Sequence, residues 1–159
     1  KLSANDSSFQ ALQPLTDLEL VNLFLKTSIV DNIVERIWHK ALVNCVINPL
    51  TAFYQCTNGD LFINAEREKK VHALCEELAN IIKQTQCPIS TSTAKIISDT
   101  KKITLLTEKN TSSMLTDIKN GRVLELEYLN RYFIRRAEQY DVPCPINLDL
   151  VNTLANISK

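Results

Sequence analysis

Only two glycines, Gly59 and Gly121, occur in this chain of 159 residues. Glycine reaches left-handed backbone conformations and lets another backbone or a ligand approach closely. A dinucleotide-binding βαβ unit needs several glycines in one short loop, both for its tight turn and for the approach of a pyrophosphate. The sequence therefore excludes such a unit within these residues.

Apolar residues recur instead at helical spacing, and strand patterns are scarce. Helices are expected at residues 16–27, 31–55, 65–84, 91–108, 112–120 and 124–140, and in a last segment that carries Leu148, Val151 and Leu154. Inward positions are predicted at Ile33, Ile37, Ile96, Ile103, Leu106, Leu126, Phe133, Ala137 and Tyr140. The predicted fold class is all-α, a helical bundle of six to eight helices in one domain over residues 1–159.

The segment 31–55 is apolar nearly all round, which is typical of a buried helix. Lys40, Asn44 and Asn48 recur in it at i, i+4 and i+8, which places one ammonium and two carboxamides on a single face. Buried polar groups are costly unless they are hydrogen-bonded. The three side chains form either a structural ladder to another helix or a ligand site, and spacing alone leaves both open. Asn48 precedes Pro49, which predicts a kink or short break there.

Charge and cysteine content limit the class of protein. Eighteen basic residues balance eighteen acidic ones, so no dominant surface for nucleic acid or for an anionic membrane is expected. The five cysteines are odd in number and include no CxxC pair, so neither a disulfide framework nor a metal site is indicated. Reduced thiols favour a cytoplasmic protein.

Four stretches carry a resemblance to a known family. Residues 38–52 read WHKALVNCVINPLTA, residues 56–61 read CTNGDL, residues 110–118 read NTSSMLTDI and residues 125–130 read ELEYLN. In order and spacing they resemble the WxKLxxNxxxNPLTA, CxNG[ED]L, NxSSMLxD and EIDx[IL]N patterns of the C-terminal domain of ketopantoate reductases. The resemblance implies a bundle similar to the C-terminal domain of 6-phosphogluconate dehydrogenase-like reductases.

The resemblance also assigns roles that the chemistry of these residues can support. Hydride reduction of a ketone leaves negative charge on oxygen, which needs a positioned proton donor, and Lys40 is similar to the family's general acid. Ser112 and Ser113 correspond to a helix start whose N–H groups favour a carboxylate, although a serine there also serves as an N-cap. The implied substrate-binding residues are Asn44, Asn48, Asn58, Asn110, Thr111, Ser112 and Ser113, and Glu125 is the implied cofactor-side residue.

The implied activity is the NADPH-dependent reduction of ketopantoate to pantoate in pantothenate (vitamin B5) and coenzyme A synthesis. The implied partners are ketopantoate, an N-terminal NADPH-binding Rossmann domain outside these residues and, in a homodimer, a second copy. Without that Rossmann domain the chain is predicted to be inactive. Two alternatives stay open: a reductase of another small 2-oxo acid, because pocket size sets that choice, or a non-catalytic relative that uses the domain for protein interaction. Arg131 departs from the family pattern, which usually has glycine there.

Overall fold

The computed structural model describes residues 32–157, and all regular secondary structure in this range is helical. The α-helices are α3 (Ile33–Tyr54), α4 (Ala65–Gln84), α5 (Thr93–Leu106), α6 (Ser113–Lys119), α7 (Asn130–Gln139) and α8 (Pro145–Ile157), and two 3-10 helices are η1 (Gly59–Phe62) and η2 (Glu125–Glu127). The predicted all-α class is confirmed for these residues. The helix expected at residues 16–27 lies outside them.

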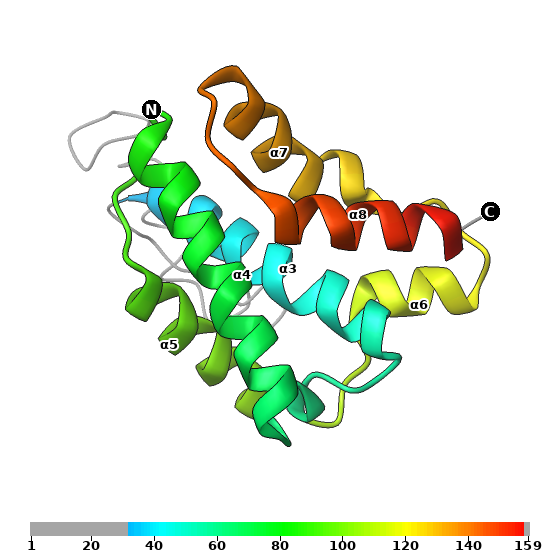
Figure 1. Ribbon diagram of the computed structural model, residues 1–159. Helices are drawn as coiled ribbons and strands as arrows, with labels where there is room; N and C mark the ends of the chain where they lie inside the picture. Colours follow the sequence, from blue (N-terminus) through cyan, green and yellow to red (C-terminus); the bar gives the residue numbers. More distant parts are fainter. Residues whose placement is uncertain (1–31, 158–159) are drawn as a thin grey trace, which may run out of the picture. The chain divides into compact units, whose positions relative to one another are not determined.

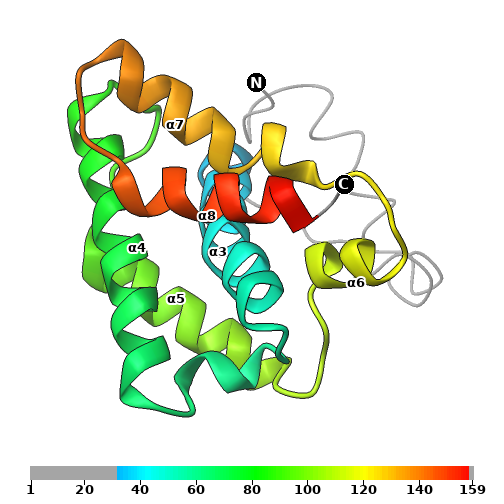
Figure 2. The same ribbon diagram turned by 45° about the vertical axis from the view of Figure 1, so that its right-hand side comes forward.

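The residues from Ile37 onward form one compact unit, and the arrangement described below is that of this unit. In the views of Figures 1 and 2, the second half of α3 lies between α4 and α6 and is crossed by α8. From Leu42 to Ala52 every residue of α3 except Asn44 is buried. The first turns differ from the prediction of a helix buried along its length, because Ile33 and Ile37 are both more than half exposed.

Of the kink or short break predicted at Pro49, the break does not occur, since α3 continues through this residue to Tyr54. A proline inside a helix removes the N–H that would bond the carbonyl four residues earlier, which here belongs to Cys45. Asn130 of α7 donates from Nδ2 to that carbonyl oxygen at 2.9 Å. The carbonyl therefore keeps a donor from outside its own helix.

Helix α5 packs on α4 with a different face from the predicted one. Ile96 is buried as expected, but Ile103 is 40% exposed and Leu106 is 72% exposed. Thr100 and Thr104 are buried instead, so the inward positions follow one another every four residues. Threonine tolerates this burial when its hydroxyl bonds a carbonyl of its own helix, as Thr104 Oγ1 does to Lys101 at 2.9 Å.

The single helix expected at residues 124–140 is divided into η2 and α7. Leu129 lies between them with φ −109° and ψ −102°, far from helical values, so the chain changes direction there. Arg131 pairs with Glu127 at 3.6 Å near the start of α7. Of the inward positions predicted in segment 124–140, Leu126, Phe133 and Ala137 are buried and Tyr140 is exposed. In the last segment Val151 and Leu154 are buried and Leu148 is exposed.

Each glycine meets a local requirement. Gly121 has φ +63° and follows α6, and the N–H groups of Gly121 and Arg122 bond back to Ile118 and Asp117, which is a Schellman ending. Gly59 packs so closely on Glu108 that an added Cβ would lie 2.9 Å from that residue's Cβ. No helix in the described range is long and apolar enough to cross a membrane.

Candidate active site

The polar face of α3 carries Lys40, Asn44 and Asn48 in order along the helix. Because α3 is continuous over these positions, the three side chains share one face. Lys40 is exposed, Asn44 is half-buried, and Asn48 is only 7% exposed. The stripe therefore runs from solvent into the interior, and its lysine lies at the exposed end rather than in the buried part.

Lys40 and Asn44 line a pocket of about 440 Å³ between α3 and α5. Val43 of α3 and Ile103 of α5 give this pocket an apolar wall. The exposure of Ile103 therefore has a local consequence, because an apolar side chain borders the same hollow as the lysine. Such a lining of apolar walls and a few polar groups is typical of small-molecule sites.

The remaining lining residues of this pocket are His39, Asp99 and Lys102. Asp99 contacts two basic groups: its Oδ2 lies 3.4 Å from His39 Nδ1, and its Oδ1 lies 2.6 Å from Lys95 Nζ. The Asp99 carboxylate thus pairs with His39 and Lys95, while Lys40 and Lys102 bring two ammonium groups to the pocket. This charge distribution favours an anionic ligand.

The inner end of the stripe contacts the start of α6. Asn48 Nδ2 donates to Ser113 Oγ at 3.3 Å. Thr51 Oγ1 and Ser112 Oγ share a hydrogen bond of 2.7 Å, and the Ser112 oxygen also accepts the N–H of Leu115. Ser112 is therefore a buried N-cap, whereas Ser113 is exposed beside Asn48. The two serines, for which the same roles were predicted, therefore have different environments.

Asn58 holds the loop that precedes α6. Its main-chain N–H donates to Asn110 O at 3.0 Å, and its Nδ2 donates to Thr107 Oγ1 at 2.9 Å. Its Oδ1 is buried without a hydrogen-bond partner among the described residues. The side chains of Asn110 and Thr111 are exposed.

The structure thus places Lys40 with Asn44, Asn48 with Ser113, and Asn58 with Asn110. Glu125 begins η2, is exposed, and does not line the Lys40 pocket.

Two polar residues that support this region were missed from the sequence. Thr51 lies one turn after Asn48 in the same motif, and its hydroxyl also bonds the carbonyl of Ile47 at 2.7 Å. Asn130 is fully buried against Cys45. The signal for Asn130 was the proline inside the helix, which leaves one carbonyl in need of a donor, but nothing local to Pro49 shows which side chain supplies it.

Solved structures define the class of domain first. The chain is similar to a dimeric ketopantoate reductase from Staphylococcus aureus, with a TM-score of 0.67 and 21% identity over 98% of this chain and 52% of that one. It is also similar to D-mandelate dehydrogenase in a ternary complex with NADH and anilino(oxo)acetate, with a TM-score of 0.73 and 24% identity over 93% and 80% of the two chains. The fold is that of the helical domain of such dehydrogenases and reductases.

The family follows from the sequence. Residues 32–158 match the family described as "Ketopantoate reductase PanE/ApbA C terminal". The 2-dehydropantoate 2-reductase of Escherichia coli O157:H7 is 36% identical over 120 residues, which cover 76% of this chain and 38% of the relative. The chain belongs to the ketopantoate reductase C-terminal domain family, as its motifs predicted. It spans less than half the length of the curated relatives that it matches.

Proposed function

We propose that this chain is the substrate-binding and proton-donating domain of an NADPH-dependent 2-dehydropantoate 2-reductase, which reduces ketopantoate to pantoate in pantothenate synthesis in the cytoplasm. One observation carries the proposal: Lys40 and Asn44 line a single pocket on a helix face that continues to Asn48 and Ser113. The activity named for the relatives supports it.

In the proposed reaction this chain supplies a proton and holds the substrate. A nicotinamide cofactor, held by the Rossmann domain, would supply hydride to the keto carbon, and the keto oxygen would then carry negative charge. The Lys40 ammonium binds that oxygen and donates a proton to it. The carboxamides of Asn44 and Asn48 offer both donors and acceptors, which suits a substrate that carries a carboxylate and a hydroxyl group.

The carboxylate end is assigned to the loop before α6. Ser113 offers an exposed hydroxyl next to Asn48, and the exposed Asn110 and Thr111 lie in the same loop. Asn58 ties that loop to η1 through two hydrogen bonds, so we assign it a holding role as well as a substrate contact. Ser112 acts in this proposal through the N-cap rather than by direct contact.

The residues of this chain do not fit a complete nicotinamide dinucleotide. Gly59 is packed on Glu108 and Gly121 ends α6, so neither is available to a phosphate-binding loop. The proposal therefore assigns NADPH to an N-terminal Rossmann domain, with Glu125 on the cofactor side. A homodimer is included, supported by the dimeric relative from Staphylococcus aureus.

A second candidate substrate is another small 2-oxo acid. Val43 and Ile103 wall one side of the pocket, and an apolar pocket distinguishes ligands that differ by one methylene only about 10- to 200-fold. The structurally similar D-mandelate dehydrogenase forms a ternary complex with NADH and anilino(oxo)acetate, which supports this second candidate. A panel of 2-oxo acids that differ in the bulk next to the keto group separates the two candidates.

The test uses the full-length protein that carries this domain, with NADPH consumption followed for each 2-oxo acid. Ketopantoate is expected to give the highest kcat/KM, and Lys40→Ala is expected to lower kcat by about 10²–10⁴ without unfolding the domain. Lys102→Ala is the matched control, because it removes the same charge from the opposite wall of the same pocket. If Lys40→Ala leaves turnover intact and lowers thermal stability instead, the polar stripe is structural.

A further inference from the structure

The helical turn that joins Asn44 to Asn48 has an unusual construction. Pro49 follows Asn48 directly and has no N–H, and the carbonyl that it fails to bond belongs to Cys45, directly after Asn44. Proline is a common cause of sharp kinks in helices. Cys45 is fully buried, so solvent does not reach this turn to bond its carbonyl. Yet the helix is continuous across it.

The missing donor comes from a side chain 85 residues away. Asn130 Nδ2 donates to Cys45 O at 2.9 Å and to Asn147 Oδ1 at 2.8 Å. Both asparagines are fully buried. The two hydrogens of one amide thus have two separate acceptors, which sets the orientation of the amide, because the opposite orientation would place Oδ1 against the Cys45 carbonyl.

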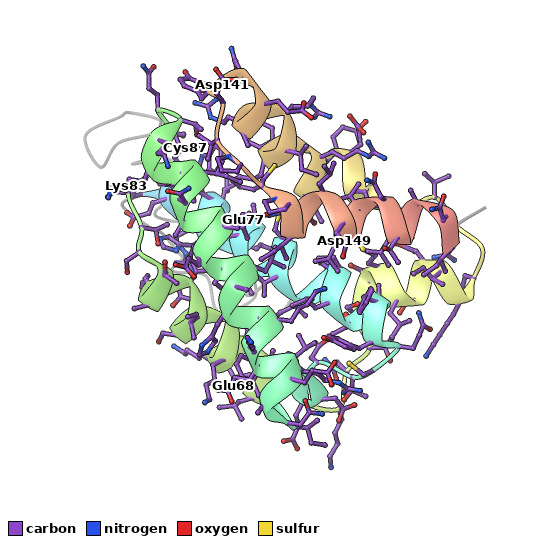
Figure 3. All side chains as sticks on the ribbon, in the orientation of Figure 1. Glu68, Glu77, Lys83, Cys87, Asp141 and Asp149 are labelled. Carbon is purple, nitrogen blue, oxygen red and sulfur yellow. The ribbon has the colours of Figure 1, made fainter. Side chains whose placement is uncertain are left out.

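The amide of Asn147 is held in turn by a carboxylate. Its Nδ2 donates to Glu77 Oε1 at 2.8 Å. Figure 3 shows Glu77 on α4 beside the first turn of α8. A continuous series of hydrogen bonds therefore runs from α4 through α8 and α7 to the one turn of α3 that lacks its own donor.

We infer that Asn130 is a positioning residue for the polar face of α3: it replaces the N–H that Pro49 lacks and keeps Asn44 and Asn48 in helical register. The bond acts on the turn between these two residues, so its loss lets α3 bend there and separates Asn44 from Asn48. The value of this register for catalysis rests on the proposed function, whereas the positioning itself does not.

Pro49→Ala tests this role, because alanine restores an N–H at position 49 that can bond the Cys45 carbonyl in place of Asn130. The unfolding equilibrium constant of the 159-residue chain is measured in urea for Asn130→Ala, for Pro49→Ala and for the double variant. Asn130→Ala is expected to raise this constant at least about tenfold, since it leaves two buried acceptors without a donor. Pro49→Ala is expected to stabilise the Asn130→Ala variant at least about fivefold more than it stabilises the original chain. Asn152→Ala, at an exposed position of α8, is the control and is expected to change little.

A second measurement separates positioning from general support of the core. The side-chain amide signal of Asn48 in a ¹⁵N–¹H spectrum is expected to shift in Asn130→Ala, together with the main-chain signal of Ser113, and to return toward its original position in the double variant. A residue that merely filled the core would not be rescued by an N–H at position 49.

Additive effects of Asn130→Ala and Pro49→Ala would overturn the inference, as would a double variant that fails to fold or an unmoved Asn48 signal. These outcomes are independent of reductase activity. Absence of ketopantoate reduction in the full-length protein would remove the proposed function and leave the coupling intact, whereas absence of coupling would leave the kinetic test of Lys40 unaffected.

Discussion

Glu77 is a buried carboxylate at the beginning of α8, and its removal has a calculable effect. Its Oε2 accepts the N–H of Ile146 at 2.8 Å, and its Oε1 accepts the N–H of Asn147 at 2.7 Å. The first N–H groups of a helix have no partner within it. Glu77 of α4 therefore accepts the first N–H groups of α8, a role that an N-cap side chain usually has for its own helix (Figure 3).

Glu77→Ala leaves these two N–H groups and the Asn147 amide without an acceptor. A hydrogen bond to a charged group contributes about 1.5–3 kcal/mol, so the two main-chain bonds alone represent about 3–6 kcal/mol. Burial of the carboxylate opposes this gain, so we expect the lower end, a loss of about 3 kcal/mol. Glu77→Gln keeps one acceptor oxygen and is expected to lose about half as much.

The assay is urea unfolding followed by circular dichroism, together with the thermal midpoint. A loss of about 3 kcal/mol corresponds to a Tm lower by about 6–12 °C in a chain of this size. Glu76→Ala is the matched control, because Glu76 is the exposed neighbour of Glu77 on α4 and carries the same charge. Its effect is expected to stay within about 0.5 kcal/mol. Equal effects of the two substitutions would refute the capping role of Glu77.

Four further outcomes are expected. Burial raises the pKa of Cys75 to about 12 and also raises the pKa of Cys45, so a thiol reagent at about pH 8 is expected to label both only on unfolding; labelling as fast as at the half-buried Cys56 would contradict this. Since an unfolded cysteine titrates near 9.0, the free energy of unfolding is expected to fall by about 1.4 kcal/mol per pH unit for each buried thiol as the pH rises above that value, and Cys75→Ala is expected to reduce the slope. Calorimetry of the isolated chain is expected to show no NADPH binding at micromolar Kd, an affinity that needs about 8 kcal/mol. In the full-length protein, Ser113→Ala is expected to raise KM for ketopantoate more than it lowers kcat, whereas Ser112→Ala is expected to lower stability by about 1 kcal/mol through loss of the N-cap; the reverse pattern would exchange their roles.

Helix positions and helix ends were largely predictable, because they depend on neighbours within a few residues. The bounds of α4 at Ala65–Gln84 agree with the predicted 65–84. Ser112 begins α6 as a cap, and Gly121 ends it in a left-handed conformation. Periodicity and capping act over one or two turns, so nearby residues are enough to predict where a helix begins and ends.

The face that a helix buries was less predictable. In α5 the apolar spacing favoured Ile103 and Leu106, but Thr100 and Thr104 lie inward. Packing on the neighbouring α4 decides this, and only the Thr104 hydroxyl bonds a carbonyl of its own helix, whereas the Thr100 hydroxyl is buried without such a bond among the described residues. The course of α3 through Pro49 is a similar case, because its donor comes from Asn130 on another helix.

Some features of the candidate site were likewise predictable from local spacing, and others were not. That Lys40, Asn44 and Asn48 share one face was predictable from their spacing, because helical geometry places residues four apart together. Three features depend on how the helices pack and were not predictable: Lys40 is exposed, Ser113 rather than Ser112 is exposed beside Asn48, and Ile103 lines the pocket. Exposure and contact depend on residues distant in the chain, and no local pattern specifies which of them pack together.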